Sequence, residues 1–273
     1  MLVIVMLVYW ITDIENNHLQ NTWTNFFNSL ISANRYRVEN GDLYDLDTRN
    51  TYFYNTLQLT YGLSGNSRFN AGFDINTIMG RIDEDRGSSL FKVFGSQGGG
   101  GSRYAKAITS IAPRIRFRPF KRNYRFTIQS SILFPTGISN EKESILGKNQ
   151  IFFLSQFLYN WPLNQRLFLF SQLSIEYGFE RTDAPPLFIS PLSIYLSYLI
   201  PKKTILFILT NYVPVFTKAD SWKYNQYTFQ VGGGVQYQFS KRILINAYYT
   251  NDIAGKTYYD FAGYNLSARF LIH

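Results

Sequence analysis

Residues Arg114 to Gly137 alternate in character along their length, and this pattern limits the folds open to the chain. The second half of the stretch carries apolar side chains on one face: Tyr124, Phe126, Ile128, Ile132 and Phe134. Its first half alternates Ile115 and Phe117 with three arginines. Successive residues of a β-strand point to opposite faces of a sheet. The stretch therefore predicts a hairpin, either of a soluble β-sandwich or of a transmembrane β-barrel with lipid outside and a polar lumen inside.

Aromatic residues are abundant in the chain and charged residues are scarce. The 273 residues are 18% aromatic and 16% charged, whereas an average globular chain has about 25% charged residues. The mean hydropathy is −0.15, which excludes a helical membrane protein. Interfacial aromatic girdles combined with a polar lumen would give this composition. Cysteine is absent, so disulfides, thiolate metal sites and cysteine nucleophiles are excluded.

The same alternation recurs along the rest of the chain, and no amphipathic helical period of useful length accompanies it. It predicts twelve strands: 26–38, 52–63, 68–82, 104–120, 124–134, 151–161, 167–180, 191–200, 204–216, 222–239, 243–250 and 257–272. In two of these, Ile151–Trp161 and Thr204–Phe216, both faces are apolar. We expect those two strands to pack against an inserted loop or an N-terminal plug.

The predicted connections alternate between tight and long, as the two ends of an up-and-down barrel do. The tight ones are 64–67, 121–123, 162–166, 201–203 and 240–242, and the long ones are 39–51, 83–103, 135–150, 181–190, 217–221 and 251–256. Every tight turn carries or adjoins a basic residue, and none of the 18 acidic residues lies in one. Basic turns suit the anionic phospholipids of an inner leaflet, so the tight turns are expected on the periplasmic side.

These observations favour the barrel over the sandwich. The predicted fold is all-β, a transmembrane up-and-down antiparallel β-barrel of about twelve strands in the bacterial outer membrane, with both termini periplasmic. Residues 24–273 would form the barrel. Residues 1–23 would be an export-signal remnant or a periplasmic lead-in, because the apolar run Met1–Ile11 is too short for a membrane-spanning helix. The alternative is that this run is a genuine N-terminal segment.

Several partners follow from this fold. The lipid bilayer and lipopolysaccharide would surround the barrel. The apolar face of the last strand, Tyr264–Ile272, resembles the C-terminal signal that the barrel-assembly machinery recognises, although the chain ends on His273 and not on an aromatic residue. The net charge of +9 comes from bases scattered over turns and strands, so no nucleic-acid partner is expected.

The inward faces of the strands supply the candidate site. The residues expected to line the lumen and meet a solute are Arg114, Arg116, Arg118, Arg125, Gln129, Glu176 and Arg269. The arginines would lie near the periplasmic half, with Asp74, Glu176 and Glu180 further out. Because arginines in a pore favour anions, one hypothesis is a channel for small anionic or polar solutes. The alternative is a packed, non-conducting barrel that serves as a structural or docking subunit of an envelope complex, which inward Phe168, Phe170, Phe207 and Leu209 would favour.

Catalysis is not expected. The only histidines are His18 and His273, both near the termini, so the lumen and loops lack the usual general base. Glu176 and Glu180 would be about 13 Å apart on one strand, too far for a glycosidase pair. No cofactor and no metal site are predicted.

Three segments together resemble a known family. They are NTLQLTYGLSGNSRFNAGFDI, the PRIRFRPF strand, and a strand ending in Pro135-Thr136-Gly137. They are similar to the outer-membrane family named for meta-pathway phenol degradation and to its wider group of barrel transporters. The resemblance covers roughly Tyr52 to Gly137 and implies a channel or transporter for small, including aromatic, molecules. It transfers no binding residue to this chain.

Overall fold

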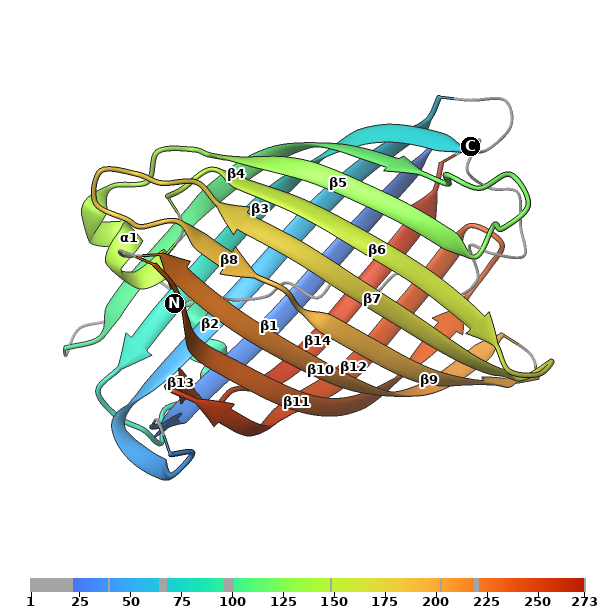
Figure 1. Ribbon diagram of the computed structural model, residues 1–273. Helices are drawn as coiled ribbons and strands as arrows, with labels where there is room; N and C mark the ends of the chain where they lie inside the picture. Colours follow the sequence, from blue (N-terminus) through green and yellow to red (C-terminus); the bar gives the residue numbers. More distant parts are fainter. Residues whose placement is uncertain are drawn as a thin grey trace.

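The chain forms a closed antiparallel barrel of twelve strands (Figure 1). This architecture comes from a computed structural model that describes residues 22–38, 40–63, 68–95, 101–147, 149–201, 203–218 and 221–272. The expected lead-in, residues 1–23, lies outside the described residues except for Thr22 and Trp23. The predicted fold class is confirmed.

Each strand pairs with its neighbours in the chain. The wall strands are β1 (Trp23–Arg37), β2 (Leu43–Gly62), β3 (Phe69–Asp83), β4 (Arg103–Phe117), β5 (Phe126–Pro135), β6 (Phe152–Pro162), β7 (Leu167–Gly178), β9 (Leu192–Ile200), β10 (Thr204–Lys218), β11 (Trp222–Gln238), β12 (Ile243–Lys256) and β14 (Ala262–Leu271). A short strand, β8 (Leu187–Ile189), continues the line of β9, and β13 (Tyr258–Tyr259) pairs with β1.

Pairing of β1 with β14 closes the barrel. The register runs from Trp23 opposite Leu271 to Ser32 opposite Ala262. Both strands therefore start or end on the same rim, which also carries the tight turns and is called the short-turn rim below. The opposite end, the long-loop rim, carries the connections 84–102, 136–151 and 179–186. Which rim faces the periplasm stays a prediction.

Outward side chains are mainly apolar, and aromatic residues gather toward both rims. Exposed examples near the short-turn rim are Tyr61, Phe120, Tyr124, Trp161, Tyr198 and Phe239, and near the long-loop rim Tyr44, Phe179, Trp222 and Tyr224. Two girdles around an apolar band are typical of barrels that cross a membrane. The core of this protein therefore lies inside the barrel, among the inward side chains.

The structure corrects several predicted boundaries. β2 begins at Leu43 and β12 continues to Lys256, so most of the predicted loops 39–51 and 251–256 is strand. The polar residues of these stretches hid the strands, because wall strands that rise above the lipid no longer need an apolar face. The last predicted strand, 257–272, is divided into β13 and β14.

Two short helical segments lie at the long-loop rim. Helix α1 (Asn140–Leu146) lies between β5 and β6, and the 3-10 segment η3 (Leu90–Phe94) lies between β3 and β4. No helix in the described ranges has the length and apolar character that membrane crossing by a helix requires.

Gly234 provides a test of inward packing. A Cβ atom at Gly234 would lie 2.3 Å from Cβ of Tyr248, whereas one at Gly233 would meet nothing closer than the Phe207 carbonyl oxygen at 3.2 Å. We expect Gly234→Ala to lower the free energy of unfolding by about 1–3 kcal/mol because it overpacks the wall. Gly233→Ala is the matched control, and we expect it to lower the free energy of unfolding by less. Urea titration in detergent micelles measures both, and equal losses would contradict this packing.

Candidate solute path through the barrel lumen

A row of hydrogen-bonded polar side chains crosses the inner wall of β1 to β4. The Asn25 amide donates to Gln58 Oε1 at 2.8 Å, and Gln58 Nε2 donates to Asp74 Oδ1 at 3.3 Å. Arg114 Nε donates to both oxygens of Asp74, at 3.0 and 2.9 Å, and its second terminal nitrogen also contacts Asp74 Oδ2. Because Arg114 and Asp74 are each 3% exposed, this is a buried ion pair that largely cancels both charges.

A second row runs parallel to the first, one step closer to the long-loop rim. Thr56 Oγ1 donates to Asn76 Oδ1 at 2.7 Å, and Asn76 Nδ2 donates to Ser110 Oγ at 2.9 Å. Buried polar groups are stable when they are paired in this way. The wall of β2 to β4 therefore presents a polar, largely satisfied surface.

The opposite part of the lumen wall carries a cluster of apolar side chains. Seven buried side chains from six strands form one cluster: Phe27, Leu158, Phe170, Tyr195, Phe207, Leu209 and Tyr248. Their rings form a chain in which centroids lie 5.7 Å apart for Phe170–Tyr195, 6.0 Å for Tyr195–Phe207 and 5.9 Å for Phe207–Tyr248. These spacings are favourable for aromatic pairs. The lumen thus has polar rows on one side, and on the other an apolar cluster that alternates with buried polar side chains such as Ser193 and Asn211.

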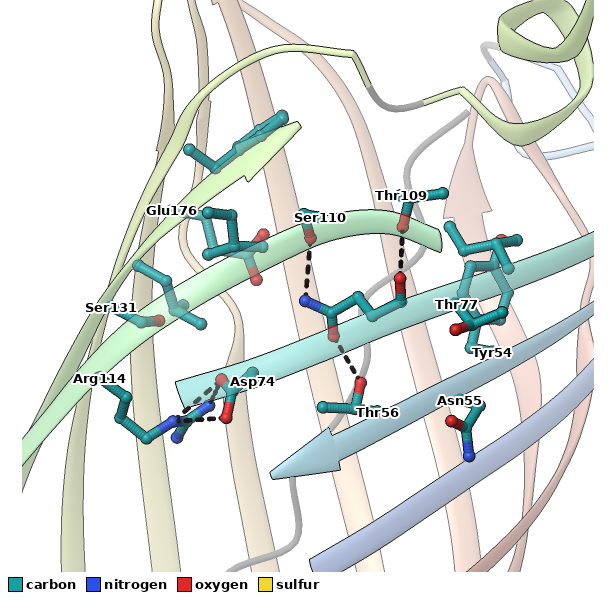
Figure 2. Close-up of a pocket in the computed structure, with 15 residues that line it drawn as sticks. Tyr54, Asn55, Thr56, Asp74, Thr77, Thr109, Ser110, Arg114, Ser131 and Glu176 are labelled. Carbon is teal, nitrogen blue, oxygen red and sulfur yellow. Dashed lines mark hydrogen bonds and ion pairs between the residues drawn. The ribbon is translucent and has the colours of Figure 1, made fainter. Parts of the chain in front are cut away.

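A cavity opens beside the polar rows (Figure 2). Its volume is about 60 Å³, and it is partly open. Asp74, Arg114, Glu176 and Ser131 lie at one end of it in Figure 2, with Thr56 and Ser110 of the second row beside them. Its lining also includes the apolar or aromatic side chains Tyr54, Ile78, Leu133, Phe152 and Leu154. A small molecule with a polar edge and an apolar body matches this lining.

Helix α1 narrows the lumen at the long-loop rim. Ile145 and Leu146 are buried in a second apolar cluster with Tyr52, Tyr54 and Ile78 of the inner wall. Gly80 makes room for the helix, because a Cβ atom there would lie 2.8 Å from Cγ2 of Ile145. Burial of each of the two helix side chains contributes roughly 1.5–3 kcal/mol. The helix is therefore a built-in constriction and not a loose loop.

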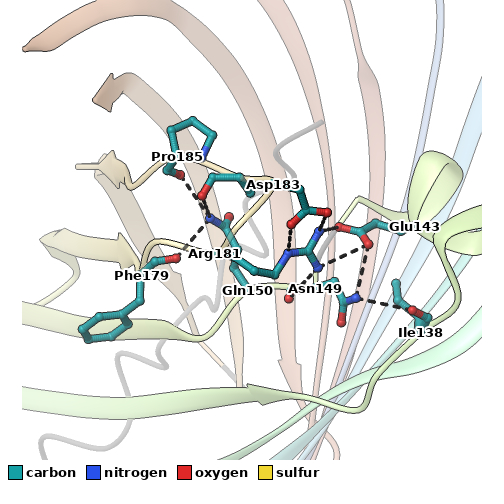
Figure 3. A network of polar contacts seen from close by, with 9 residues as sticks. Ile138, Glu143, Asn149, Gln150, Phe179, Arg181, Asp183 and Pro185 are labelled. Atoms are coloured by element: carbon teal, nitrogen blue, oxygen red, sulfur yellow. Dashed lines mark hydrogen bonds and ion pairs between the residues drawn. The ribbon is translucent and has the colours of Figure 1, made fainter. Parts of the chain in front are cut away.

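Arg181 ties this helix to the connection between β7 and β8 (Figure 3). Its guanidinium donates to Glu143 of α1 at 2.6 Å, to Asp183 at 2.5 and 2.8 Å, and to the Asn149 carbonyl oxygen at 3.0 Å. Hydrogen bonds from Arg181 hold the pKa of the Asp183 carboxyl below its ordinary value. Asp183 therefore stays ionised until the pH falls below the usual carboxylate range, and at neutral pH all these contacts are present.

The structure places most of the predicted site residues on the lumen wall but does not bring them into one cluster. Arg114 and Glu176 line the cavity. Arg116 lies opposite Gln129 in the β4–β5 register, and Gln129 donates to Gln156 at 2.8 Å. Arg118 and Arg125 lie beside the ends of β4 and β5, at the short-turn rim.

The last predicted site residue is held by an aromatic ring, and one predicted lumen residue is misplaced. The Arg269 guanidinium lies 3.5 Å from the Trp23 ring centroid, beside Asn25 in the β1–β14 register. Glu180 lies past the end of β7, exposed in the connection, so its expected place in the lumen is wrong.

Three features of the lumen were not fully predicted from the sequence. Asp74 was placed on the inner wall, but its pairing with Arg114 depends on a diagonal contact, since Arg114 is registered opposite Gly72. Helix α1 carried no recognisable signal apart from two apolar residues in a polar loop. The apolar cluster agrees in part with the sequence, because inward Phe170, Phe207 and Leu209 belong to it. Its members are side chains of the wall strands, however, whereas the expected packing partner was an inserted loop or an N-terminal plug.

Comparisons with known proteins identify the architecture. No family model matches the chain, and no curated protein matches it by sequence. An outer membrane channel from Pseudomonas putida F1 superposes with a TM-score of 0.73 at 13% identity, over 97% of this chain and 100% of that one. The β domain of the Bordetella autotransporter BrkA superposes with a TM-score of 0.59 at 12% identity, over 92% of this chain and 99% of that one. The porin NanC superposes with a TM-score of 0.52 at 9% identity, over 90% of this chain and 98% of that one.

These likenesses are of fold, and they place the chain among the β-barrels of the bacterial outer membrane. The predicted localisation is confirmed. The resemblance to the phenol-degradation family, which no family model supports, stays a prediction.

The buried ion pair of the polar row can be tested by a double-mutant cycle. We expect Arg114→Gln and Asp74→Asn each to lower the free energy of unfolding by about 3–5 kcal/mol, because each removes one member of a buried ion pair. The double variant should lose less than the sum of the two. Urea unfolding of the four proteins in micelles measures this coupling. Strictly additive losses would show that the two side chains do not act as a pair.

Proposed function

We propose that the protein is an outer-membrane channel for passive or facilitated passage of small amphiphilic solutes. The observation that carries this proposal is the two-sided lumen, with polar rows on β1 to β4, an apolar cluster opposite and the cavity beside them. A molecule with an aromatic or aliphatic body and one polar group has favourable contacts along both sides. The likeness to an outer membrane channel and to a porin supports a channel role.

The order of features along the barrel describes a route for such a solute. Helix α1 and its cluster come first at the long-loop rim, then the cavity, then the arginines of β4 and Arg269 near the short-turn rim. We assign the long-loop rim to the outside of the cell and the short-turn rim to the periplasm. Arginines that line a pore favour anions, so the proposal includes a modest preference for an anionic group.

A second candidate function is a non-conducting barrel that serves as a structural or docking subunit of an envelope complex. The filling of the lumen favours it, because α1 and the apolar cluster both occupy space that a wide aqueous pore would need. A barrel of this size lies between small barrels filled by side chains and large porins with open channels. Conductance distinguishes the two candidates.

Ion selectivity tests the channel proposal. In planar bilayers we expect small conductance steps from the wild-type protein with weak anion preference. Asp74→Asn should raise the anion-to-cation permeability ratio by up to about fivefold, the factor that corresponds to roughly 1 kcal/mol for one unbalanced charge near a passing ion in water. Benzoate, an anionic aromatic probe, should reduce the current more than glucose does.

The Asp74→Gln variant is the matched control, because it also removes the charge and should shift selectivity in the same direction. If ion selectivity is the same in the wild type and in both variants, the cavity beside Asp74 is not part of the path that ions take. Absence of conductance steps in every protein would favour the non-conducting barrel.

Release of helix α1 tests the constriction. Arg181→Gln removes the contacts to Glu143 and Asp183, so the helix should leave the lumen for part of the time and mean conductance should rise. Lys142→Gln also removes one positive charge, from an exposed side chain of α1. It should have no such effect. Single-channel recordings of both variants measure the difference. An unchanged conductance in Arg181→Gln would mean that α1 does not limit the path.

A further inference from the structure

The connection between β3 and β4 folds back onto the outside of the barrel. Its helical segment η3 contacts β2 and β3, and the Phe94 ring lies 4.8 Å from the Phe53 ring in an edge-on arrangement. Phe53 points outward, since its neighbours Tyr52 and Tyr54 belong to the lumen cluster. Strands β2 and β3 are therefore covered by α1 on the inner face and by η3 on the outer face.

The segment covers polar groups of the outer wall. On the face of Phe53 lie Thr51, which is 1% exposed, and the Arg81–Asp83 ion pair with a 2.7 Å contact. Asp83 also accepts hydrogen bonds at 2.9 Å from Ser88 and from Ser102, which flank η3 in the chain. An ion pair facing lipid without cover would be costly. The connection is thus held on the wall by the groups that it shields.

The outer side of the segment is apolar apart from one cation. Phe91 is 67% exposed and Phe94 is 50% exposed, while Val93 is fully buried against the wall. Lys92 is exposed between the two phenylalanines. Aromatic side chains with an adjacent lysine are typical of segments that lie in the boundary between lipid headgroups and acyl chains.

We propose that η3 inserts Phe91 and Phe94 into the interfacial layer of the membrane, and that Lys92 pairs there with the phosphate of a lipid headgroup. The wall on which η3 lies is already the lipid-facing side of the barrel, so the segment extends that contact beyond the strands. Assignment to the outer leaflet rests on the proposed orientation, whereas insertion itself does not depend on conduction.

Spin labelling tests the insertion. The chain has no native cysteine, so a single nitroxide can be attached at Phe91→Cys. Collision rates with oxygen and with a water-soluble nickel chelate are measured in vesicles of phosphatidylcholine and phosphatidylglycerol. Phe73→Cys, an outward wall position, is the lipid reference, and Lys142→Cys on α1 is the water reference.

We expect the oxygen-to-nickel ratio at position 91 to lie near that at 73 and several-fold above that at 142. A ratio equal to that at 142 would overturn insertion, and low collision rates with both reagents would indicate a protein partner instead. Conductance of the same preparations is recorded separately. Absence of conductance together with a lipid-like ratio at position 91 would contradict the channel proposal alone. Conductance together with a ratio equal to that at position 142 would contradict insertion alone.

The headgroup contact has its own test. With a label at Phe94→Cys, adding Lys92→Glu should lower the oxygen-to-nickel ratio in vesicles containing phosphatidylglycerol and should change it less in pure phosphatidylcholine, because one lysine near an anionic surface favours binding by about fivefold. Lys92→Arg should restore the original ratio. Equal effects of Lys92→Glu in both vesicles would overturn the phosphate contact.

Discussion

Backbone hydrogen bonding is the constraint on which the rest of this structure depends. A strand in lipid has no water to satisfy its amide and carbonyl groups, so each strand needs a partner on both sides. Pairing of β1 with β14 meets that need by joining the two ends of the sheet. Once the wall is closed, its side chains are divided into an outer set for lipid and an inner set that is free to define a path.

The inner set is not uniform around the wall. Polar residues on β1 to β4 satisfy one another in rows, with Arg114 and Asp74 as the only charges in the row that starts at Asn25. Across the lumen, rings from β7, β9, β10 and β12 pack in contact. This division is the basis on which we propose passage of amphiphilic solutes.

Much of the wall could be predicted from the sequence, because alternation with period two is a local property. The hairpin around Lys121 and Arg122 and the inward direction of Arg114 and Gln129 followed from it directly. Contacts that depend on strand register or on distant segments could not be predicted in this way. Asp74 contacts Arg114 diagonally, and α1 contacts Tyr52, which lies some ninety residues earlier in the chain. Polar strand ends such as residues 45–50 were also missed, since most of their residues are polar.

Gly80 shows how the width of such a lumen can be set far from the loop that narrows it. Helix α1 can pack against the wall here only because Gly80 has no side chain. Any larger residue there would compete with Ile145 for the same space and displace the helix without altering its sequence. A barrel of this kind can therefore change from narrow to wide through one codon in a strand, while its loops, its closure and its lipid-facing surface stay as they are.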